Sequence, residues 1–217
     1  MYKDRSHAGK LLADKLRAYS ESADCIVLAL PRGGVPVGFE LAQELKLPLD
    51  VFIVRKLGTP GQKELAMGAI ASGGIRVLNR GIIDALAVNQ ASLEEVTRLE
   101  LIELQRREFA YRGSNEPLEL KDKTVILTDD GLATGASMRA AVRAVRSMQP
   151  RRIIVAVPVS SPGTCRELGR EVDEMICAAQ PQEFWGVGEW YDNFEQTSDE
   201  EVHRLLDRAR ALHNSAA

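Results

Sequence analysis

The sequence predicts an α/β fold, with a doubly wound, mostly parallel sheet flanked by helices. Short, continuous apolar runs recur along the chain, which is typical of strands buried on both faces of a parallel sheet. These runs cover residues 25–30, 49–54, 125–127, 152–159 and 174–177. Stretches with helical spacing of apolar residues separate the runs, so right-handed crossovers should join neighbouring parallel strands.

Composition and charge exclude several classes of function. The chain has 217 residues and 45% apolar content, which suits a single domain over residues 1–217 with a proper core. Lys and Arg number 28 against 31 Asp and Glu, for a net charge of −3, which argues against a general nucleic-acid binder. No apolar run approaches a membrane span, and no signal peptide is visible. Cys25, Cys165 and Cys177 lack zinc spacing, so we expect reduced, buried thiols in a cytoplasmic protein.

Residues 125–137, with the sequence VILTDDGLATGAS, carry the strongest chemical signal. An apolar strand, two carboxylates, a loop of small residues and a helix over 138–148 follow one another. The first amides of such a helix lack intrahelical partners and attract an anion. Asp129 and Asp130 would repel a phosphate, so they suit a neutral polyol, a metal or a cationic transition state beside it. The alternative is an ordinary strand, turn and helix with a threonine cap.

This stretch resembles the phosphoribosyl pyrophosphate (PRPP) motif of the type I phosphoribosyltransferases. The resemblance implies that Asp129 and Asp130 hold the ribose hydroxyls. It also implies that a loop cradles the 5′-phosphate, namely Ala133, Thr134, Gly135, Ala136 and Ser137. A member of this family would have PRPP and pyrophosphate as ligands and would use Mg²⁺.

A second strand, glycine loop and helix unit precedes the first. Arg32, Gly33 and Gly34 follow the apolar run 25–30, and a helix is expected from residue 35 or 36 to about 45. The segment resembles the pyrophosphate loop of the family, in particular that of the adenine enzymes. In the family this loop often contains a cis non-proline peptide. The alternative is a tight turn made by the two glycines.

Two cations end the next strand. Arg55 and Lys56 follow the run 49–54, at the edge where open parallel sheets bind ligands. The Gly- and Pro-rich residues 57–64 resemble the flexible loop that closes over PRPP in the family. The alternative is a solvated surface loop. Residues 65–70 and 75–78 indicate a hairpin.

Residues 80–113 predict a helical insertion that packs on the core or on a partner subunit. Ser92 and Glu95 form a capping-box pattern, and Gly113 is a suitable C-cap. A helix is also expected over 6–20, where Arg5 and His7 are given no role. Ser198 should cap the final helix.

Residues 180–198 are rich in aromatic side chains and resemble the C-terminal hood of the 6-oxopurine enzymes. The resemblance rests on Pro181, Phe184, Val187, Gly188 and Asp192, with one extra residue after Phe184. It implies that Phe184 stacks on the base and that Asp192 binds Mg²⁺. Trp185 adds a second stacking face. The alternative is a small satellite core beneath a loop.

The acceptor is less well defined. The 6-oxopurine enzymes carry an aspartate as general base where this chain has Ala133. Hypoxanthine and guanine should therefore be poor substrates, and we expect a different small heterocyclic acceptor. The leading hypothesis is transfer of the phosphoribosyl group to a nitrogen atom, by a homodimer that binds neither nucleic acid nor membrane. The alternatives are a non-catalytic regulator that binds PRPP or a nucleotide, and PRPP-related chemistry such as phosphorolysis.

Overall fold

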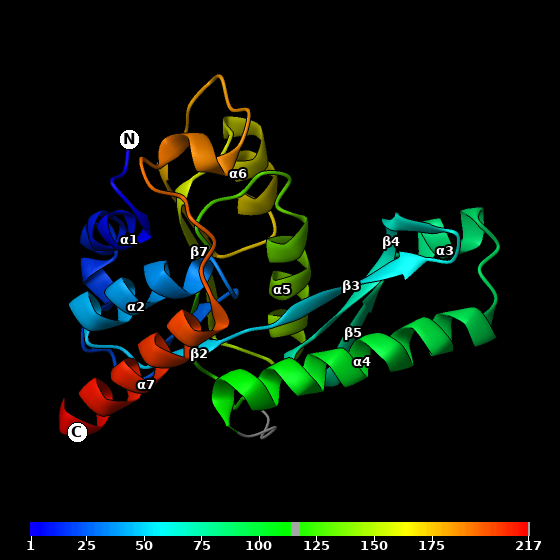
Figure 1. Ribbon diagram of the computed structural model, residues 1–217, viewed down its shortest axis with the longest axis horizontal. Coiled ribbons are helices and arrows are strands. Elements are labelled where there is room, and N and C mark those ends of the chain that lie inside the picture. The colour runs from blue at the N-terminus through cyan, green and yellow to red at the C-terminus, as the bar shows by residue number, and fades with distance from the viewer. Residues whose placement is uncertain (114–117, 217) are drawn as a thin grey trace.

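A computed structural model describes residues 1–113 and 118–216 (Figure 1). Its centre is a five-stranded parallel sheet with the strand order β2-β1-β6-β7-β8. The strands are β1 (Cys25–Ala29), β2 (Leu49–Val51), β6 (Thr124–Thr128), β7 (Arg152–Val159) and β8 (Glu174–Ala179). Every residue of β1 and β6 is buried, because helices cover both faces of the sheet.

Helices cover the two faces according to the alternation of the strand side chains. Helices α1 (Arg5–Asp14) and α2 (Gly34–Leu45) pack on the face that carries Val27 and Ile126. Helices α5 (Ala136–Ser147) and α6 (Pro162–Gly169) pack on the face that carries Leu28 and Leu127. The doubly wound parallel sheet is therefore confirmed.

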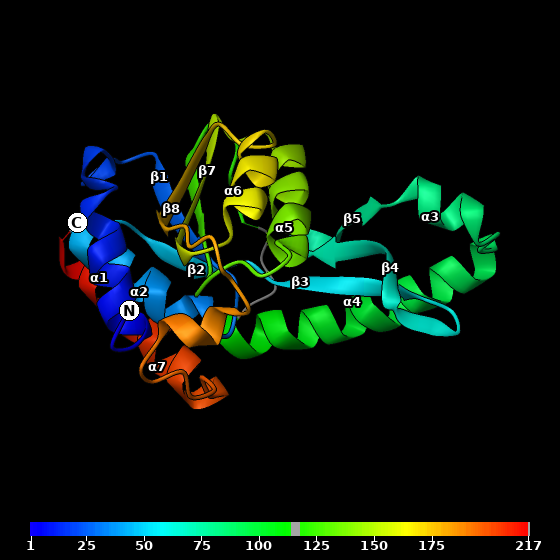
Figure 2. The same cartoon turned by 90° about the horizontal axis from the view of Figure 1, so that it is seen from above.

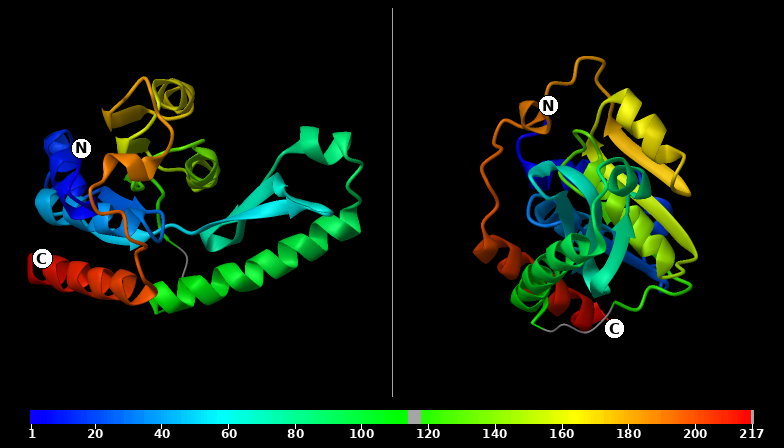
Figure 3. Two further views of the ribbon diagram at one scale, coloured as in Figure 1. Left: turned by 45° about the horizontal axis from the view of Figure 1, so that its top comes forward. Right: turned by 90° about the vertical axis from the view of Figure 1, so that its right-hand side faces the viewer.

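The predicted insertion is larger than residues 80–113 and begins with strands. Strands β3 (Val54–Thr59), β4 (Gln62–Ala71) and β5 (Ile75–Leu78) form a separate antiparallel sheet. Helices α3 (Arg80–Ala85) and α4 (Gln90–Arg112) complete the unit, which we call the arm (residues 54–112). Figures 2 and 3 show the arm projecting from the side of the central sheet, with α4 along its length.

The arm corrects two expectations. The strand predicted over 49–54 leaves the parallel sheet after Val51, and the chain turns into β3 at Val54. Residues 57–64 are not a loop, because β3 and β4 pair across a two-residue turn at Pro60 and Gly61. Gly61 has a φ of 81°, which a glycine adopts without steric cost. The hairpin predicted over 65–78 is confirmed by β4 and β5.

The ends of two helices differ in detail from the prediction. The first helix stops at Asp14, and a short 3₁₀ turn (Arg17–Tyr19) replaces its expected last turn. Helix α4 begins earlier than the capping box implied, because the Asn89 side chain accepts the amide of Ser92. Gly113 ends the helix in the left-handed conformation, as expected.

The last part of the chain returns to both the sheet and the arm. A 3₁₀ turn (Val187–Trp190) lies within residues 180–198 and joins a small apolar cluster with Tyr2 and Tyr191. Helix α7 (Asp199–Ala216) then packs against α2 and α4. Ser198 caps α7, since its hydroxyl accepts the amide of Glu201.

The cysteines differ from the prediction. Cys165 on α6 forms a disulfide with Cys177 on β8, while Cys25 is free and buried. Sequence spacing did not reveal this pair, because α6 folds back beside β8 and brings the two side chains together. The expectation of three reduced thiols was wrong. No helix among the described residues is long and apolar enough to span a membrane.

Candidate functional site

The acid pair stands at the carboxyl end of β6. The backbone amide of Asp130 donates to Oδ1 of Asp129 at 2.9 Å, which holds the Asp129 carboxylate beside the Asp130 backbone. Both residues are half-buried, and the side chain of Asp130 is 15% exposed. This is the edge of a parallel sheet at which ligands bind.

The glycine loop after β1 packs directly on the acid pair, because β1 and β6 are neighbours in the sheet. A Cβ on Gly33 would stand 2.1 Å from Oδ2 of Asp130. One on Gly34 would stand 2.9 Å from the Cα of Asp129. Only glycines allow this approach. The Pro31–Arg32 peptide bond is cis, as the family resemblance led us to expect.

Arg5 completes this arrangement, although nothing in the sequence singles it out. Its Nε donates to Oδ2 of Asp130 at 2.8 Å, and its NH1 donates to the carbonyl of Glu195 at 2.7 Å. The guanidinium also stacks on the ring of Phe194, with its carbon 4.0 Å from the ring centre. Tyr191 closes the same side, where its hydroxyl donates to the Asp130 carbonyl at 2.6 Å.

Burial dominates the electrostatics of the acid pair. Loss of solvent raises the pKa of Asp129 well above its ordinary value, and the charge of Asp130 raises it further. Loss of solvent also raises the pKa of Asp130, against the opposing effect of Arg5. The pKa of Tyr191 is raised by burial and then by Asp130. A positively charged group beside two such carboxylates would stabilise their ionised forms.

Residues 131–137 form a loop of mostly small residues that leads into α5. Gly135 has a φ of 70°, and the amide of Ala136 donates to the Thr134 hydroxyl at 3.4 Å. From α6, the Thr164 hydroxyl donates to the carbonyl of Ala133 at 3.1 Å, which holds the loop from behind. The residues that face outward are exposed, namely Ala133, Thr134, Ala136 and Ser137. The first amides of α5 lack intrahelical partners, which makes this loop suited to a phosphate.

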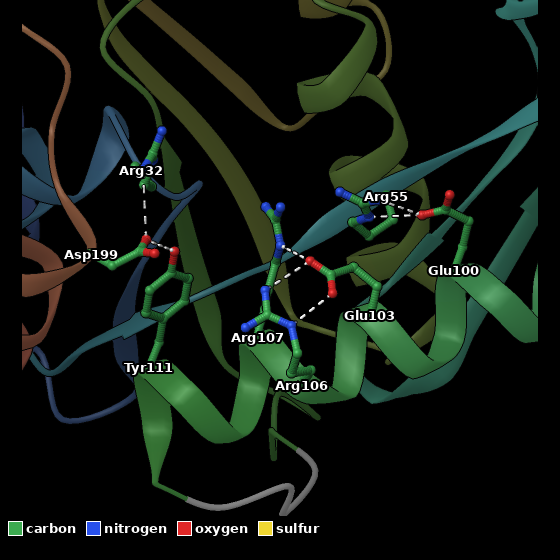
Figure 4. A network of polar contacts seen from close by, with 8 residues as sticks. All are labelled: Arg32, Arg55, Glu100, Glu103, Arg106, Arg107, Tyr111 and Asp199. Atoms are coloured by element: carbon green, nitrogen blue, oxygen red, sulfur yellow. Dashed lines mark hydrogen bonds and ion pairs between the residues drawn. The ribbon is translucent and has the colours of Figure 1, made fainter.

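Helix α4 supports the cations predicted for the pyrophosphate (Figure 4). Arg32 lies 3.8 Å from Asp199, which accepts a hydrogen bond from Tyr111 of α4 at 2.5 Å. Burial, followed by this bond, raises the pKa of Tyr111 to about 12. Arg55 forms an ion pair with Glu100 of α4 at 2.7 Å.

Lys56 points to the other side of β3, as alternation along a strand requires. It lines a cleft between the arm and α5, together with Ser137, Arg139 and Asn79. The structure therefore places Lys56 in the same cleft as the end of the 131–137 loop, which we call the phosphate loop, whereas Arg55 turns toward α4.

The aromatic residues of the 180–198 segment have separate environments. Phe184 packs on the cluster of Tyr2, Val159 and Tyr191. Trp185 is 84% exposed. Asp192 is also exposed, and its backbone amide donates to the carbonyl of Tyr2 at 2.8 Å. Within residues 1–113 and 118–216, no group of three or more acidic, His or Cys side chains could hold a metal by itself.

Known proteins share this pattern. The family model of the phosphoribosyl transferase domain matches residues 2–192. A Mycobacterium tuberculosis protein described as a candidate phosphoribosyl transferase, MT0597, is 44% identical over 209 residues. The match covers 96% of this chain but 47% of that protein, so the chain spans about half the length of this relative.

Two further relatives differ in how much they cover. The crystal structure of TT1426 from Thermus thermophilus has a TM-score of 0.82 and 40% identity. That match covers 95% of this chain and 97% of TT1426. The bifunctional protein PyrR of Haemophilus influenzae is 36% identical over 74 residues, which are 32% of this chain and 41% of that protein.

The fold and the site define an α/β protein that presents a loop of small residues at a helix N-terminus beside paired carboxylates, at the edge of a parallel sheet. The match over residues 2–192 then identifies the family: the chain belongs to the phosphoribosyl transferases.

Proposed function

We propose that the protein transfers the 5-phosphoribosyl group of PRPP to a nitrogen atom of a small heterocycle and releases pyrophosphate. The observation that carries this proposal is the contact between the two loops. Gly33 and Gly34 pack on Asp129 and Asp130, so a sugar held by the carboxylates has an anion site on either side. PRPP has a phosphate on one side of its ribose and a pyrophosphate on the other, so one molecule would occupy both anion sites.

The acid pair has the chemistry that the reaction needs. When the bond from C1 to pyrophosphate breaks, the ribose becomes oxocarbenium-like and gains positive charge. Asp129 and Asp130 are held in place before the reaction, and their raised pKa values reflect a cost of ionisation that a nearby cation relieves. Such fixed charges stabilise a transition state more than the ground state.

The phosphates would be divided between the two loops. Residues 134–137 would take the 5′-phosphate with the first amides of α5, which lack intrahelical partners, and with the Thr134 and Ser137 hydroxyls. The Gly33–Gly34 backbone and Arg32 would take the pyrophosphate. Lys56 faces the phosphate loop from the arm, and Arg55 would join only after leaving Glu100.

Mg²⁺ fits this site as a companion of the substrate. The ion binds proteins through one or two carboxylates and completes its shell with water and phosphate oxygens. A pair of carboxylates without a third ligand offers that number. Bound there, the ion would neutralise charge on the departing pyrophosphate. Asp192, which the family resemblance implies as an Mg²⁺ ligand, is exposed within residues 180–198 and would contact such an ion apart from this pair, since the described residues include no group of three such side chains.

The acceptor would bind between the phosphate loop and residues 180–198. Ala133 provides no group that could take a proton, so we expect a planar heterocycle whose nitrogen needs little general-base help. Trp185 is free to stack on it. The absence of a base at Ala133 also suits the second candidate, a regulator that binds PRPP or a nucleotide without turnover.

The test measures pyrophosphate release from PRPP and Mg²⁺ with a panel of purine, pyrimidine and other heterocyclic bases. Turnover that Asp129→Asn abolishes and Asp207→Asn leaves intact supports the enzyme, since Asp207 pairs only with Arg210 at the surface in the described structure. Thermal stabilisation by PRPP without turnover supports the regulator. Failure of millimolar PRPP and Mg²⁺ to shift the melting temperature overturns both.

A further inference from the structure

The outer side of α4 exposes three large apolar side chains. Leu99, Ile102 and Phe109 are 52%, 54% and 62% exposed, and their spacing places them on one side of the helix. The opposite side, with Leu93 and Leu104, is buried in a core that also contains residues of β3, β4 and α7. No other helix among the described residues exposes more than one large apolar side chain. Figures 1 and 2 show α4 running along one side of the arm's strands, and its inner side, with Leu93 and Leu104, packs on Leu57 and Met67 of those strands.

Four charged residues flank Leu99 and Ile102 along the helix, namely Glu95, Arg98, Glu103 and Arg106. Arg98 pairs with Glu95 at 2.8 Å, and Glu103 pairs with both Arg106 and Arg107 at 2.7 Å (Figure 4). The signs therefore run acid, base, acid, base along the helix. We call these four residues with Leu99 and Ile102 the α4 stripe.

The α4 stripe is complementary to itself. Its midpoint lies between Glu100 and Leu101. Glu95 and Arg106 are equally far from this point, and so are the other two pairs: Arg98 with Glu103, and Leu99 with Ile102. A two-fold axis through the midpoint places each residue of an antiparallel second helix opposite its counterpart. Every acid then faces a base, and Leu99 faces Ile102.

A parallel arrangement has no such match, because in register it sets Glu95 against Glu95 and Arg98 against Arg98. The antiparallel order is therefore the one that the charges favour. In that arrangement four apolar side chains form the centre, and two neutral clusters of two acids and two bases border it. This is the pattern of an interface with an apolar core and a polar rim.

We propose that α4 pairs antiparallel with α4 of a second copy of this chain, with the two-fold axis passing between Glu100 and Leu101. The pairing braces the helix whose inner side holds Arg55 through Glu100 and Asp199 through Tyr111. The inference does not depend on the reaction that the site catalyses.

The test uses the full chain in sedimentation equilibrium, over a range of concentrations. The wild-type protein should be a dimer. Glu95→Arg and Arg106→Glu each replace two attractive contacts per dimer with repulsive ones, so each should weaken the dimer at least about tenfold. An equimolar mixture of the two variants should restore the dimer, since the substituted positions then meet as opposite charges.

Ile102→Asp should also give a monomer, while Leu11→Asp, on an apolar residue of α1 that is 45% exposed, should remain a dimer. Restored pairing in the mixture shows that both charge variants are folded. The proposal is overturned by a wild-type protein that stays monomeric. It is equally overturned by a dimer that survives the charge reversals, or by a mixture that stays monomeric although both variants melt like the wild type.

Discussion

Arg5 and Asp130 are 125 positions apart in the chain, yet the guanidinium of the first donates to the carboxylate of the second at 2.8 Å. The ion pair is largely shielded from water, with the two side chains 11% and 15% exposed. One of the two acids therefore has a cationic partner within the fold, whereas the Asp129 carboxylate accepts only the amide of Asp130 among residues 1–113 and 118–216. Removing the negative charge of Asp129, which has no ionic partner, should therefore change stability more than removing that of Asp130.

Replacing Asp129 with asparagine should stabilise the protein at neutral pH while it stops turnover. The pKa of Asp129 is raised by burial, so the folded state binds a proton more tightly than the unfolded state. Its contribution to the free energy of unfolding is thus fully present below the unfolded pKa of about 3.9 and is lost as pH rises through the folded value. Asparagine keeps the oxygen that accepts the Asp130 amide and removes the charge.

Melting temperatures measured from pH 4 to pH 8 check this expectation. The variant should match the wild type near pH 4 and exceed it at pH 8 by about 2–4 °C, as a gain on the order of 1 kcal/mol gives in a domain of this size. A variant that melts below the wild type at pH 8 would show that the carboxylate is a structural hydrogen-bond acceptor.

Gly33→Ala should disturb the acid pair itself. The new Cβ would lie 2.1 Å from Oδ2 of Asp130, so the loop or the carboxylate must move. We expect a loss of about 1–3 kcal/mol in stability and a large fall in turnover. Gly81→Ala, in α3 of the arm, is the control, because its Cβ would meet Asn79 at an ordinary 3.5 Å. That control should keep its activity, and equal activity of the two variants would separate the Gly33 loop from the site.

Tyr191→Phe should reduce turnover through the backbone of Asp130. The change removes the hydroxyl that donates to the Asp130 carbonyl at 2.6 Å and leaves that oxygen without this donor. Tyr2→Phe removes a similar hydroxyl, which donates to the carbonyl of Pro158 at 2.8 Å in the same cluster. Each change should lower stability by about 1–3 kcal/mol. Only Tyr191→Phe should lower kcat, and a matching loss in Tyr2→Phe would assign both tyrosines to packing alone.

Trp185 and Phe184 should separate into a substrate contact and a core residue. Trp185 is exposed, so Trp185→Ala should leave the melting temperature unchanged and raise the KM of the acceptor about fivefold, with the KM of PRPP unaltered. Phe184→Ala should lower the melting temperature, because the ring packs on Tyr191 and its neighbours. If Trp185→Ala leaves the acceptor KM unchanged, the segment does not stack on the base through this residue.

Reduction of the disulfide should lower stability and loosen the phosphate loop. Cys165 and Cys177 are 12 positions apart, and closing a loop of about 15 residues contributes about 3 kcal/mol. Helix α6, which the disulfide ties to β8, also carries the Thr164 hydroxyl that holds Ala133. We therefore expect dithiothreitol to lower the melting temperature by several degrees and to weaken PRPP binding.

The control for that experiment is the double variant Cys165→Ala and Cys177→Ala, in which dithiothreitol should change neither quantity. Cys25 does not interfere, since burial raises the pKa of its thiol to about 11. An unchanged wild-type melting temperature in the reductant would show that the disulfide contributes no stability.

Local patterns were enough to predict the sheet. Runs such as residues 125–127 are apolar because helices bury both sides of each strand, and that signal lies within a few residues. The glycine loop was predicted for the same reason, since Gly33 and Gly34 follow a strand directly. The contact between that loop and Asp130 follows from the pairing of β1 with β6.

Distant partners explain what was missed. Nothing near Arg5 in the sequence distinguishes it from a solvated arginine, because its partners lie at Asp130, Phe194 and Glu195. The arm was underestimated for another reason. Pro60 and Gly61 are typical of a flexible loop and of a tight hairpin turn alike, and only the pairing of β3 with β4 decides between the two.

The bond from Tyr191 to Asp130 also has a consequence for biosynthesis. These residues are 61 positions apart, and Asp130 is translated first. At about 5–20 residues per second, the ribosome needs about 3–12 s to pass from one to the other. During that interval the nascent chain already contains both carboxylates and both glycine loops, but not the hydroxyl that fixes the Asp130 backbone. The backbone of Asp130 is thus fixed late in translation, after the parallel sheet has its strands.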